Sequence, residues 1–344
     1  MDLPASTLRL NSHLDLALAP LQRDLQAVTD RVLSALTDPA ARKVVYLISA
    51  GGKRLRPALV LLAGLSGRTQ DHRALIETAT AVELIHTATL IHDDIIDASP
   101  RRRSQPTFHT RWGTERAVLM GDYLYATAFT LLAGLSAAPV VRVMAGVCQD
   151  LCRGELREVE ARYRLDLQES DYLSIIHDKT ASLIGGCARV GAYLGGCPSK
   201  MIDRLEQFAI NFGLAFQIID DCLDLMGDPR RLGKSTLADI DKGTLSLPII
   251  YLTRQLSASH RRRLFAPLRR AAGACRTGAV GPVADPAFLA RVAKAAKESG
   301  AIAQAQARAA AFIQAGQDTL SAVPLNGLSH TYDALANYAL SRTN

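Results

Sequence analysis

Two clusters of aspartates set in apolar stretches limit what this chain can fold into. The first is DDIID, beginning at Asp93, and the second is DDCLD, beginning 127 residues later at Asp220. Because residues four apart share one face of a helix, Asp93 is expected beside Asp97 and Asp220 beside Asp224. Carboxylates stacked in this way repel each other and are costly to bury unless a cation lies between them. One cluster is compatible with a solvated helix end, but two copies flanked by Ile and Leu favour a cavity that holds hard divalent cations.

Basic segments alternate with the aspartate clusters. GGKRLRP at 51–57 places three cations on a glycine turn, and three arginines at 101–103 follow the first cluster closely. KT at 179–180 and GK at 233–234 add further cations. Each segment alone is typical of a solvated loop. Their alternation with carboxylates, which suit Mg²⁺, is better explained by binding of a diphosphate together with Mg²⁺.

Apolar residues recur at helical spacing over most of the chain, and convincing alternating strands are absent. Helices are predicted at 14–36, 71–97, 115–135, 138–161, 168–194 and 199–226, and through the C-terminal third. No repeat or linker marks a seam, and the Gly/Ala/Pro-rich stretch 271–286 is expected to be a long surface loop. The sequence therefore predicts an all-α fold, with residues 1–344 forming a single large helical bundle and the first ~20 residues peripheral.

Composition narrows the class of protein. The chain is 48% hydrophobic with a net charge of +7, so a sizeable core and anionic partners are expected. No stretch reaches the length of uncharged apolar residues that a membrane span needs, and no secretory signal is expected. Six cysteines are sparse usage, and Cys148 and Cys152 are interpreted as buried small hydrophobes rather than a metal pair. A cytoplasmic location is expected.

Composition alone permits a basic nucleic-acid binder, but the two aspartate clusters contradict that class, so no nucleic acid is expected as a partner.

From about Lys43 to Tyr338 the sequence resembles the trans-isoprenyl diphosphate synthases, the polyprenyl synthetase family. The motifs that carry the resemblance are GGKRLRP at 51–57, HTATLIHDDIID at 86–97, RR at 102–103, GDYL at 121–124, KT at 179–180, FQIIDDCLDL at 216–225 and GK at 233–234. The resemblance implies a helical bundle around a deep central cavity, the isoprenoid synthase type I fold, commonly as a homodimer. The implied reaction is 1'-4 condensation of isopentenyl diphosphate with an allylic diphosphate such as farnesyl diphosphate.

The resemblance also implies a role for each matching residue. Two to three Mg²⁺ ions are implied, held by Asp93 and Asp97 on one side and by Asp220 on the other. Asp94, Asp221 and Asp224 support these ligands. The allylic diphosphate is implied to bind Arg102, Lys179 and Lys234. Isopentenyl diphosphate is implied to bind Lys53, Arg56, His86 and Arg103. Thr180 and Gln217 flank the developing carbocation, whose formation depends on neutralising the leaving diphosphate. Without the resemblance, His86 would be interpreted as a satisfied core histidine.

Two departures from the family pattern stand out. Ser104 replaces the glycine that usually follows the arginine pair, and Thr244 replaces a lysine of many members, with Lys242 two residues earlier. In the family that the sequence resembles, side chains lining the cavity below the first aspartate cluster set the product length. The resemblance therefore implies this role for Ala88 and Thr89, which lie one helical turn before Asp93. Both are small, whereas short-chain members often carry an aromatic floor there, so an octaprenyl-like long chain is predicted. An alternative is that the facing helix provides the floor of the cavity, through Tyr125, Phe129 or Leu132.

Other functions remain as alternatives. One is a shorter-chain synthase that makes geranylgeranyl or farnesyl diphosphate, which the small Ala88 disfavours. Another is a non-catalytic partner subunit of a synthase, which the six intact motif aspartates disfavour. The excess of arginines in late segments, at 261–263 and 269–270, is either plain surface or a peripheral contact with an anionic membrane that receives the product. The allylic primer and the downstream quinone or other lipid are left open.

Overall fold

The structure is a computed structural model that describes residues 12–39, 41–49, 53–68, 71–103, 105–226, 237–276 and 285–342. Its residues group into two compact units, and each is described by itself. Unit 1 comprises Met1–Gly146, Ile184–Gln207 and Thr319–Tyr338, and unit 2 comprises Val147–Leu183, Phe208–Asp318 and Ala339–Asn344. The described elements are almost entirely helical, which confirms the predicted all-α class.

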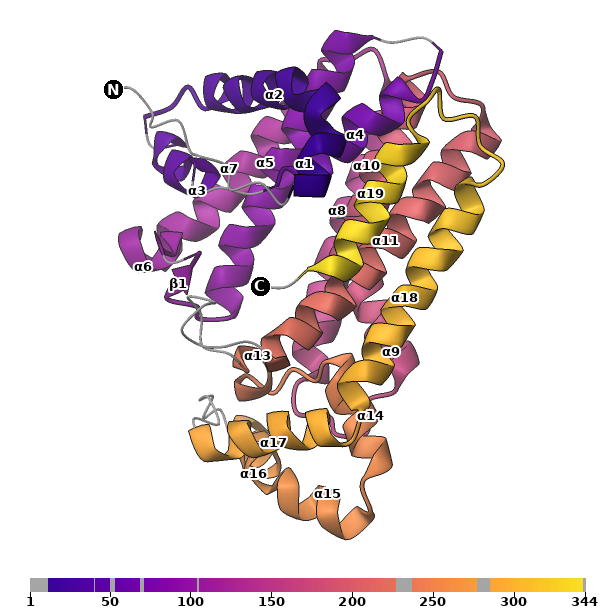
Figure 1. The fold of residues 1–344 in the computed structure, drawn as a ribbon. Helices are drawn as coiled ribbons and strands as arrows, with labels where there is room; N and C mark the ends of the chain where they lie inside the picture. Colours follow the sequence, from indigo (N-terminus) through magenta and orange to yellow (C-terminus); the bar gives the residue numbers. More distant parts are fainter. Residues whose placement is uncertain are drawn as a thin grey trace. The chain divides into compact units, whose positions relative to one another are not determined.

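Unit 1 is built around the long helix α5. Its elements are α1 (Ser12–Leu18), η1 (Ala19–Leu21), α2 (Gln22–Ala35), η2 (Ala41–Val44), α3 (Val45–Ser49), α4 (Leu55–Leu65), α5 (His72–Ile96), β1 (Arg101–Arg102), β2 (Gln105–Pro106), α6 (Phe108–Trp112), α7 (Thr114–Ala133) and the start of α8 (Ala138–Ala161). Parts of α10 (Ser182–Leu194), α11 (Ser199–Met226), α18 (Ala301–Leu320) and α19 (Ser329–Ser341) complete it. Helix α5 packs against α7, α4 and α2 (Figure 1).

Helix α5 begins where the sequence supplies a cap. The Asp71 carboxylate accepts a hydrogen bond from the Ala74 amide at 3.0 Å, which satisfies one of the free amides of the first turn. Among the described helices, α5 is the one long and apolar enough to cross a membrane, and 72% of its most apolar 18-residue window is buried inside the protein. Burial of that kind is also the property of a core helix.

Glycines allow α10 to approach α4 closely within unit 1. A Cβ at Gly191 would lie 2.1 Å from the Val60 carbonyl oxygen, and one at Gly195, just after α10, would lie 2.3 Å from the Gly64 carbonyl oxygen. Because these neighbours are main-chain atoms, no side-chain rotation would relieve such contacts. The helices therefore meet at backbone distance.

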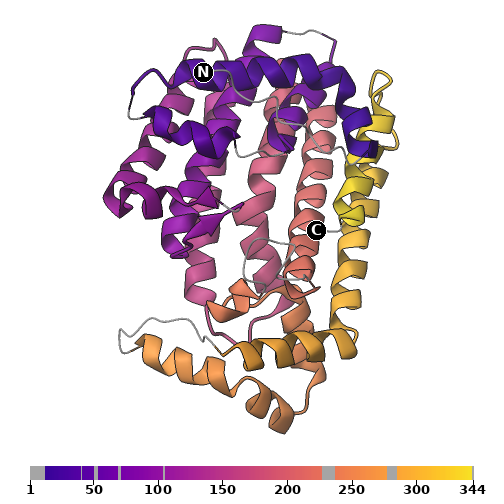
Figure 2. The same ribbon diagram turned by 60° about the vertical axis from the view of Figure 1, so that its left-hand side comes forward.

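Unit 2 contains the remaining part of α8, followed by α9 (Glu169–Ile176) and the π-helical turn η3 (His177–Ala181). Later elements are the C-terminal part of α11, α13 (Ala238–Asp241), α14 (Leu247–Gln255), α15 (Ala258–Leu264), α16 (Ala266–Arg276), α17 (Pro286–Glu298) and most of α18. Helix α17 runs crosswise to α18 (Figure 2). Helix α9 begins with a capping box between Gln168 and Asp171.

Several predicted elements are confirmed and others are wrong in detail. The helices predicted at 71–97, 138–161 and 199–226 are present as α5, α8 and α11. The first predicted helix is interrupted at η1, which contains Pro20, because proline lacks an amide donor. The helix predicted at 168–194 is interrupted by η3.

Two smaller predictions are also wrong. The start of the predicted loop 271–286 is helical, because the alanine-rich α16 continues to Arg276, and residues 277–284 lie outside the described part of the chain. Cys152 is exposed and Cys148 partly exposed rather than buried, since both lie on an outer part of α8.

Candidate active site

The first aspartate cluster lies at the C-terminal end of α5. Asp97 caps the helix, and its amide donates to the Asp93 carbonyl at 2.8 Å, so the two carboxylates are one turn apart as predicted. Asp93 and Asp97 are partly exposed. Asp94 is buried, and its Oδ1 accepts a hydrogen bond from Arg102 Nε at 2.9 Å. The outer carboxylates are therefore accessible, and the middle one is anchored to the protein.

A short hairpin supplies Arg102. Strands β1 and β2 pair antiparallel, with Arg102 opposite Gln105. The Thr107 hydroxyl donates to the Ser99 carbonyl at 2.8 Å, which ties the end of the hairpin to the end of α5. Arg103 has a left-handed backbone conformation, with φ of 48°. Ser104, which replaces the glycine of the family pattern, lies outside the described residues.

Arginines gather around His86, two turns before Asp93 on α5. Arg56 Nη1 lies 3.1 Å from His86 Nε2. Burial lowers the pKa of His86 well below its usual value. Four arginine charges lower this pKa further, namely those of Arg56, Arg103, Arg102 and Arg54. His86 is therefore neutral near pH 7, and the positive charge around it forms a site suited to an anion with several oxygens.

Arg54 and Lys53 flank this cluster. Arg54 pairs with buried Glu83 and donates to the Ile48 carbonyl at 2.9 Å, so it holds the entry to α4. Lys53 Nζ donates to the Tyr338 hydroxyl at 2.5 Å and lies 4.1 Å from the centre of its ring. The glycines at 51–52 lie outside the described residues. The hydrogen bond and the ring contact of Lys53 are thus both with Tyr338 of α19.

The second aspartate cluster, on α11 in unit 2, repeats the arrangement of the first. Asp220 and Asp224 are partly exposed, whereas Asp221 is buried. Asp221 accepts hydrogen bonds from the Tyr172 hydroxyl at 2.7 Å and from Gln217 Nε2 at 2.9 Å. Burial raises the pKa of Asp221 well above the usual carboxyl value, the Asp239 charge adds to this rise, and the two hydrogen bonds oppose it.

The structure brings Thr180 to the second cluster. The Thr180 hydroxyl donates to Gln217 Oε1 at 3.0 Å, so a chain of hydrogen bonds runs from Thr180 through Gln217 to Asp221. Lys179 Nζ forms ion pairs with Glu155, at 2.7 Å, and with Glu158, both on α8. Lys234, the third predicted lysine, lies outside the described residues.

Asp220 has a partner from the C-terminal end of the chain. Arg342 forms an ion pair with Asp220, and its guanidinium carbon lies 3.9 Å from the centre of the Phe216 ring. These contacts place a cation beside the first carboxylate of the second cluster. The Asp220 carboxylate is therefore positioned to pair with a cation.

The predicted chain-length residues lie in the middle of α5. Ala88 is fully buried. The Thr89 hydroxyl donates to the His86 carbonyl at 2.7 Å, so it is bonded to its own helix. Tyr125 on α7 lies opposite this part of α5, with its ring 6.1 Å from that of His92. The α5 residue that Tyr125 faces is thus His92, one helical turn after Ala88.

Comparison with known proteins shows the family. Residues 39–276 match the sequence pattern described as polyprenyl synthetase. The chain is 35% identical over 309 residues to "Heptaprenyl diphosphate synthase component 2" of Geobacillus stearothermophilus, covering 89% of this chain and 92% of the relative. The chain belongs to the polyprenyl synthetase family. It is a trans-prenyltransferase, as the sequence predicted.

Solved polyprenyl synthases have the same fold. A polyprenyl synthase from Caulobacter crescentus, complexed with calcium and isoprenyl diphosphate, matches with a TM-score of 0.86 and 30% identity, covering 96% of this chain and 98% of that one. A decaprenyl diphosphate synthase from Rhodobacter capsulatus matches with a TM-score of 0.85 and 30% identity, covering 96% and 99%.

The donor set of this polyprenyl synthetase fits a hard divalent cation. Within the described ranges, no group of three or more His, Cys, Asp or Glu side chains is arranged as a metal site. Mg²⁺ in phosphate sites is held by one or two carboxylates together with phosphate oxygens and waters, so a pair such as Asp93 and Asp97 is sufficient from the protein. The calcium in the Caulobacter structure is consistent with divalent metal use in the family.

Some residues of these sites have no signal in the sequence motifs. They are Tyr172, Glu155, Glu158, Glu83, Tyr338 and Arg342. Glu155 and Glu158 lie three residues apart on α8, a spacing that indicates a shared helix face. The others come from distant segments, and their contacts depend on how helices pack rather than on local pattern.

Proposed function

We propose that this enzyme is a Mg²⁺-dependent synthase that condenses isopentenyl diphosphate with an allylic diphosphate to make a long, octaprenyl-like all-trans polyprenyl diphosphate. The observation that carries the proposal is the group of arginines around His86, which lies two turns before Asp93 and three turns before Asp97 on α5. A cationic site next to paired carboxylates suits a diphosphate bound together with a metal ion. The relatives named heptaprenyl, solanesyl and decaprenyl synthases support a long chain.

The residues have separate tasks in this proposal. Bound Mg²⁺ would neutralise the diphosphate that leaves the allylic carbon. Asp93, Asp97 and Asp220 would hold the ions. Asp224 would support them, since it is partly exposed, as Asp220 is. Arg56, Arg103 and Lys53 bind isopentenyl diphosphate, with neutral His86 as a further polar contact.

In this proposal Lys179 of unit 2 contacts the diphosphate of the allylic substrate. The family resemblance assigns Arg102 of unit 1, and Lys234, to the same ligand. The Thr180 hydroxyl donates to Gln217, which leaves the oxygen lone pairs of Thr180 to face positive charge that develops at the allylic carbon. Asp221, bound by Tyr172 and Gln217, holds the orientation of that amide.

The direct test is incubation with labelled isopentenyl diphosphate, farnesyl diphosphate and Mg²⁺, followed by sizing of the products. We expect elongation that EDTA stops and added Mg²⁺ restores. Absence of turnover with geranyl, farnesyl and geranylgeranyl diphosphate as primers would refute the proposed activity. In that case the alternative is a non-catalytic subunit, because the Geobacillus relative is named as one component of a synthase.

Chain length gives a sharper prediction. We expect Ala88→Phe to shorten the main product by several isoprene units, because a phenyl ring at this buried position of α5 blocks the path of the growing chain. Leu132→Ala on α7 is the reverse change at a buried position and is expected not to shorten it. An unchanged product distribution on chromatography for Ala88→Phe contradicts the assignment. Relatives named geranylgeranyl and geranylfarnesyl synthases make a shorter product the alternative.

The lowered pKa of His86 predicts a pH dependence of stability. Its usual pKa is 6.5. Below that pH the unfolded chain binds a proton on this histidine and the folded protein does not, so the free energy of unfolding falls as the pH falls. The loss is at most about 1.4 kcal/mol per pH unit. Urea denaturation at about pH 7.5 and pH 5.5 measures it, and His86→Gln is expected to reduce the slope by this amount. Equal slopes in the two proteins would contradict the prediction.

A homodimer is proposed through the outer face of α7. Val118 and Leu119 are 42% and 67% exposed there. Two large apolar side chains exposed in succession along one helix favour contact with a second copy of the chain. Light scattering is expected to give the dimer mass, and Leu119→Glu is expected to give the monomer. Tyr193→Glu, also at an exposed apolar residue, is the matched control and is expected to leave the dimer intact.

The basic surface of unit 2 is proposed to contact an anionic membrane. Residues 242–284 contain eight Lys and Arg and no Asp or Glu. Arg261, Arg262 and Arg263 on α15 are exposed, and no ion pair involves them among the described residues. A polyprenyl diphosphate is an amphiphile, so a lipid surface is a suitable acceptor for the product.

The membrane proposal predicts selective binding to charged vesicles. We expect sedimentation with phosphatidylglycerol vesicles and not with phosphatidylcholine vesicles, and a loss of about fivefold in affinity for each arginine of α15 replaced by Ala. Arg291→Ala and Lys294→Ala are controls, because those side chains lie 3.9 Å and 3.7 Å from acidic partners. Binding to nucleic acid but not to charged vesicles would overturn the proposal.

A further inference from the structure

Opposite charges alternate on α8 and on the π-helical turn η3 that packs against it. On α8 the order is Arg153, Gly154, Glu155, then Arg157 and Glu158. On η3, Asp178 precedes Lys179. Asp178 pairs with the two arginines, and Lys179 pairs with the two glutamates. Neighbouring residues of the turn are thus held by opposite charges on the same helix.

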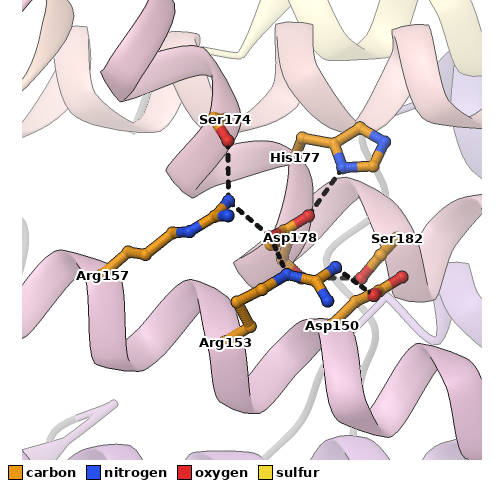
Figure 3. A network of polar contacts seen from close by, with 7 residues as sticks. All are labelled: Asp150, Arg153, Arg157, Ser174, His177, Asp178 and Ser182. Atoms are coloured by element: carbon orange, nitrogen blue, oxygen red, sulfur yellow. Dashed lines mark hydrogen bonds and ion pairs between the residues drawn. The ribbon is translucent and has the colours of Figure 1, made fainter.

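Asp178 is the centre of a hydrogen-bond network (Figure 3). Its Oδ2 accepts from Arg153 Nε at 2.8 Å and from Arg157 Nη1 at 3.0 Å. Its Oδ1 lies 3.0 Å from His177 Nδ1. The side chain is only 7% exposed. Burial alone would raise the pKa of Asp178, but the hydrogen bonds and charges of Arg153 and His177 outweigh it and lower this pKa.

The network links three consecutive helical segments. Arg157 Nη1 also donates to Ser174 on α9, at 2.9 Å, and the Ser182 hydroxyl at the start of α10 donates to the Asp178 carbonyl at 2.7 Å. Arg153 pairs in turn with Asp150. Arginines of α8 therefore hold the Asp178 carboxylate. The bonds of Ser174 and Ser182 attach the segments before and after the turn to the same network.

Gly154 brings the two backbones together. A Cβ at this position would lie 2.4 Å from the Lys179 amide nitrogen and 2.9 Å from the Asp178 carbonyl carbon. The turn therefore lies directly on α8 between the two pairs of charges. A shift of the turn by one residue would place Asp178 opposite glutamates and Lys179 opposite arginines, so the charges specify a single register.

We propose that Asp178, held by Arg153 and Arg157, is a positioning residue that fixes η3 and thereby sets where Lys179 and Thr180 meet the substrate. The inference rests on the proposed function, in which Lys179 contacts the allylic diphosphate and Thr180 the developing cation. A π-helical turn inserts one residue into a helix, and it needs such contacts to keep its register. Asp178 itself touches neither substrate nor metal in this proposal.

The test replaces Asp178 by Asn, which keeps the size of the side chain and removes its charge. We expect kcat/KM for the allylic diphosphate to fall by about 10- to 100-fold, since small displacements of substrate-binding groups have effects of this size. The KM for isopentenyl diphosphate is expected to stay unchanged. Amide hydrogen exchange in residues 177–182 is expected to become faster, which reports on the turn independently of activity.

Arg157→Gln is the second variant, and it is informative if Asp178→Asn fails to fold. It leaves the bond from Arg153 to Asp178 in place, so we expect the same changes at smaller size. Glu169→Gln is the matched control, because Glu169 is a carboxylate of α9 that accepts from Arg308 at 3.0 Å and from Tyr251 at 3.0 Å. It is expected to lower stability without a selective effect on the allylic substrate.

Lys179→Ala separates failure of this inference from failure of the proposed function. If Lys179→Ala loses activity while Asp178→Asn and Arg157→Gln keep wild-type kcat/KM and exchange rates, the positioning role is overturned. If Lys179→Ala keeps full activity, the proposed contact of Lys179 is overturned, and hydrogen exchange alone then decides whether Asp178 fixes the turn. A selective loss in all three variants, absent in Glu169→Gln, supports the inference.

Discussion

Asp93→Asn is expected to reduce turnover by about 1,000-fold and to leave the free energy of unfolding unchanged. Removing a carboxylate that stabilises the charge of the transition state through a bound cation has an effect of this order. Asp93 is partly exposed at the end of α5, and asparagine keeps the size of the side chain, so water can solvate the new amide without rearrangement of the core. Steady-state assays and urea denaturation measure the two quantities.

Asp94→Asn, one residue along, is expected to behave differently. Asp94 is 1% exposed, and both Nε and Nη2 of Arg102 lie 2.9 Å from its Oδ1. Loss of this charge leaves the guanidinium without its counter-charge, at a cost of about 3 kcal/mol. Activity is expected to fall together with stability, because the hairpin that carries Arg102 loses its attachment.

The comparison of Asp93→Asn with Asp94→Asn has a control variant, and two results would contradict it. Asp203→Asn on α11 removes an exposed carboxylate 3.2 Å from Arg189 and is expected to change neither quantity measurably. If Asp93→Asn lowers stability as much as Asp94→Asn does, then Asp93 is a structural residue rather than a metal ligand. If it keeps wild-type turnover, the proposed role of the first cluster is wrong.

The sequence was sufficient to predict the long helices and the pairing of carboxylates within each cluster. Both depend on local periodicity, and spacing of four residues places Asp93 above Asp97 whatever the tertiary structure. The different burial of Asp94 and Asp221 was not predictable, because it depends on Arg102 from a hairpin and on Tyr172 from α9. The family resemblance named the basic residues, but not the carboxylates Glu155 and Glu158 that Lys179 contacts.

The π-helical turn marks another limit of sequence reasoning. Residues 168–194 have the apolar spacing of one continuous helix, and a single inserted residue changes that spacing too little to be noticed. The turn depends on Asp178 and on Gly154 of α8, which lies 24 residues earlier in the chain. Arg342 is a similar case, since nothing in the C-terminal sequence indicates contact with Asp220.

Gly154→Ala is expected to have the second large effect. The added methyl would lie 2.4 Å from the main-chain nitrogen of Lys179, so α8 and η3 must move apart. Overpacking of this kind costs about 1–3 kcal/mol, and a neighbour that is backbone places the cost at the upper end. Displacement of the turn is also expected to lower kcat/KM for the allylic diphosphate.

Gly146→Ala on the same helix separates this packing effect from helix propensity. A Cβ at Gly146 would meet nothing within 4 Å, so this variant is expected to gain about 0.5–1 kcal/mol, because alanine loses less backbone entropy than glycine in a helix. The two substitutions are chemically identical and differ only in what faces the new methyl. Opposite changes in the free energy of unfolding are therefore expected in urea denaturation, with turnover lost only in Gly154→Ala. Equal changes at the two positions would mean that α8 does not approach the turn at backbone distance, and the register argument for Asp178 would lose its structural basis.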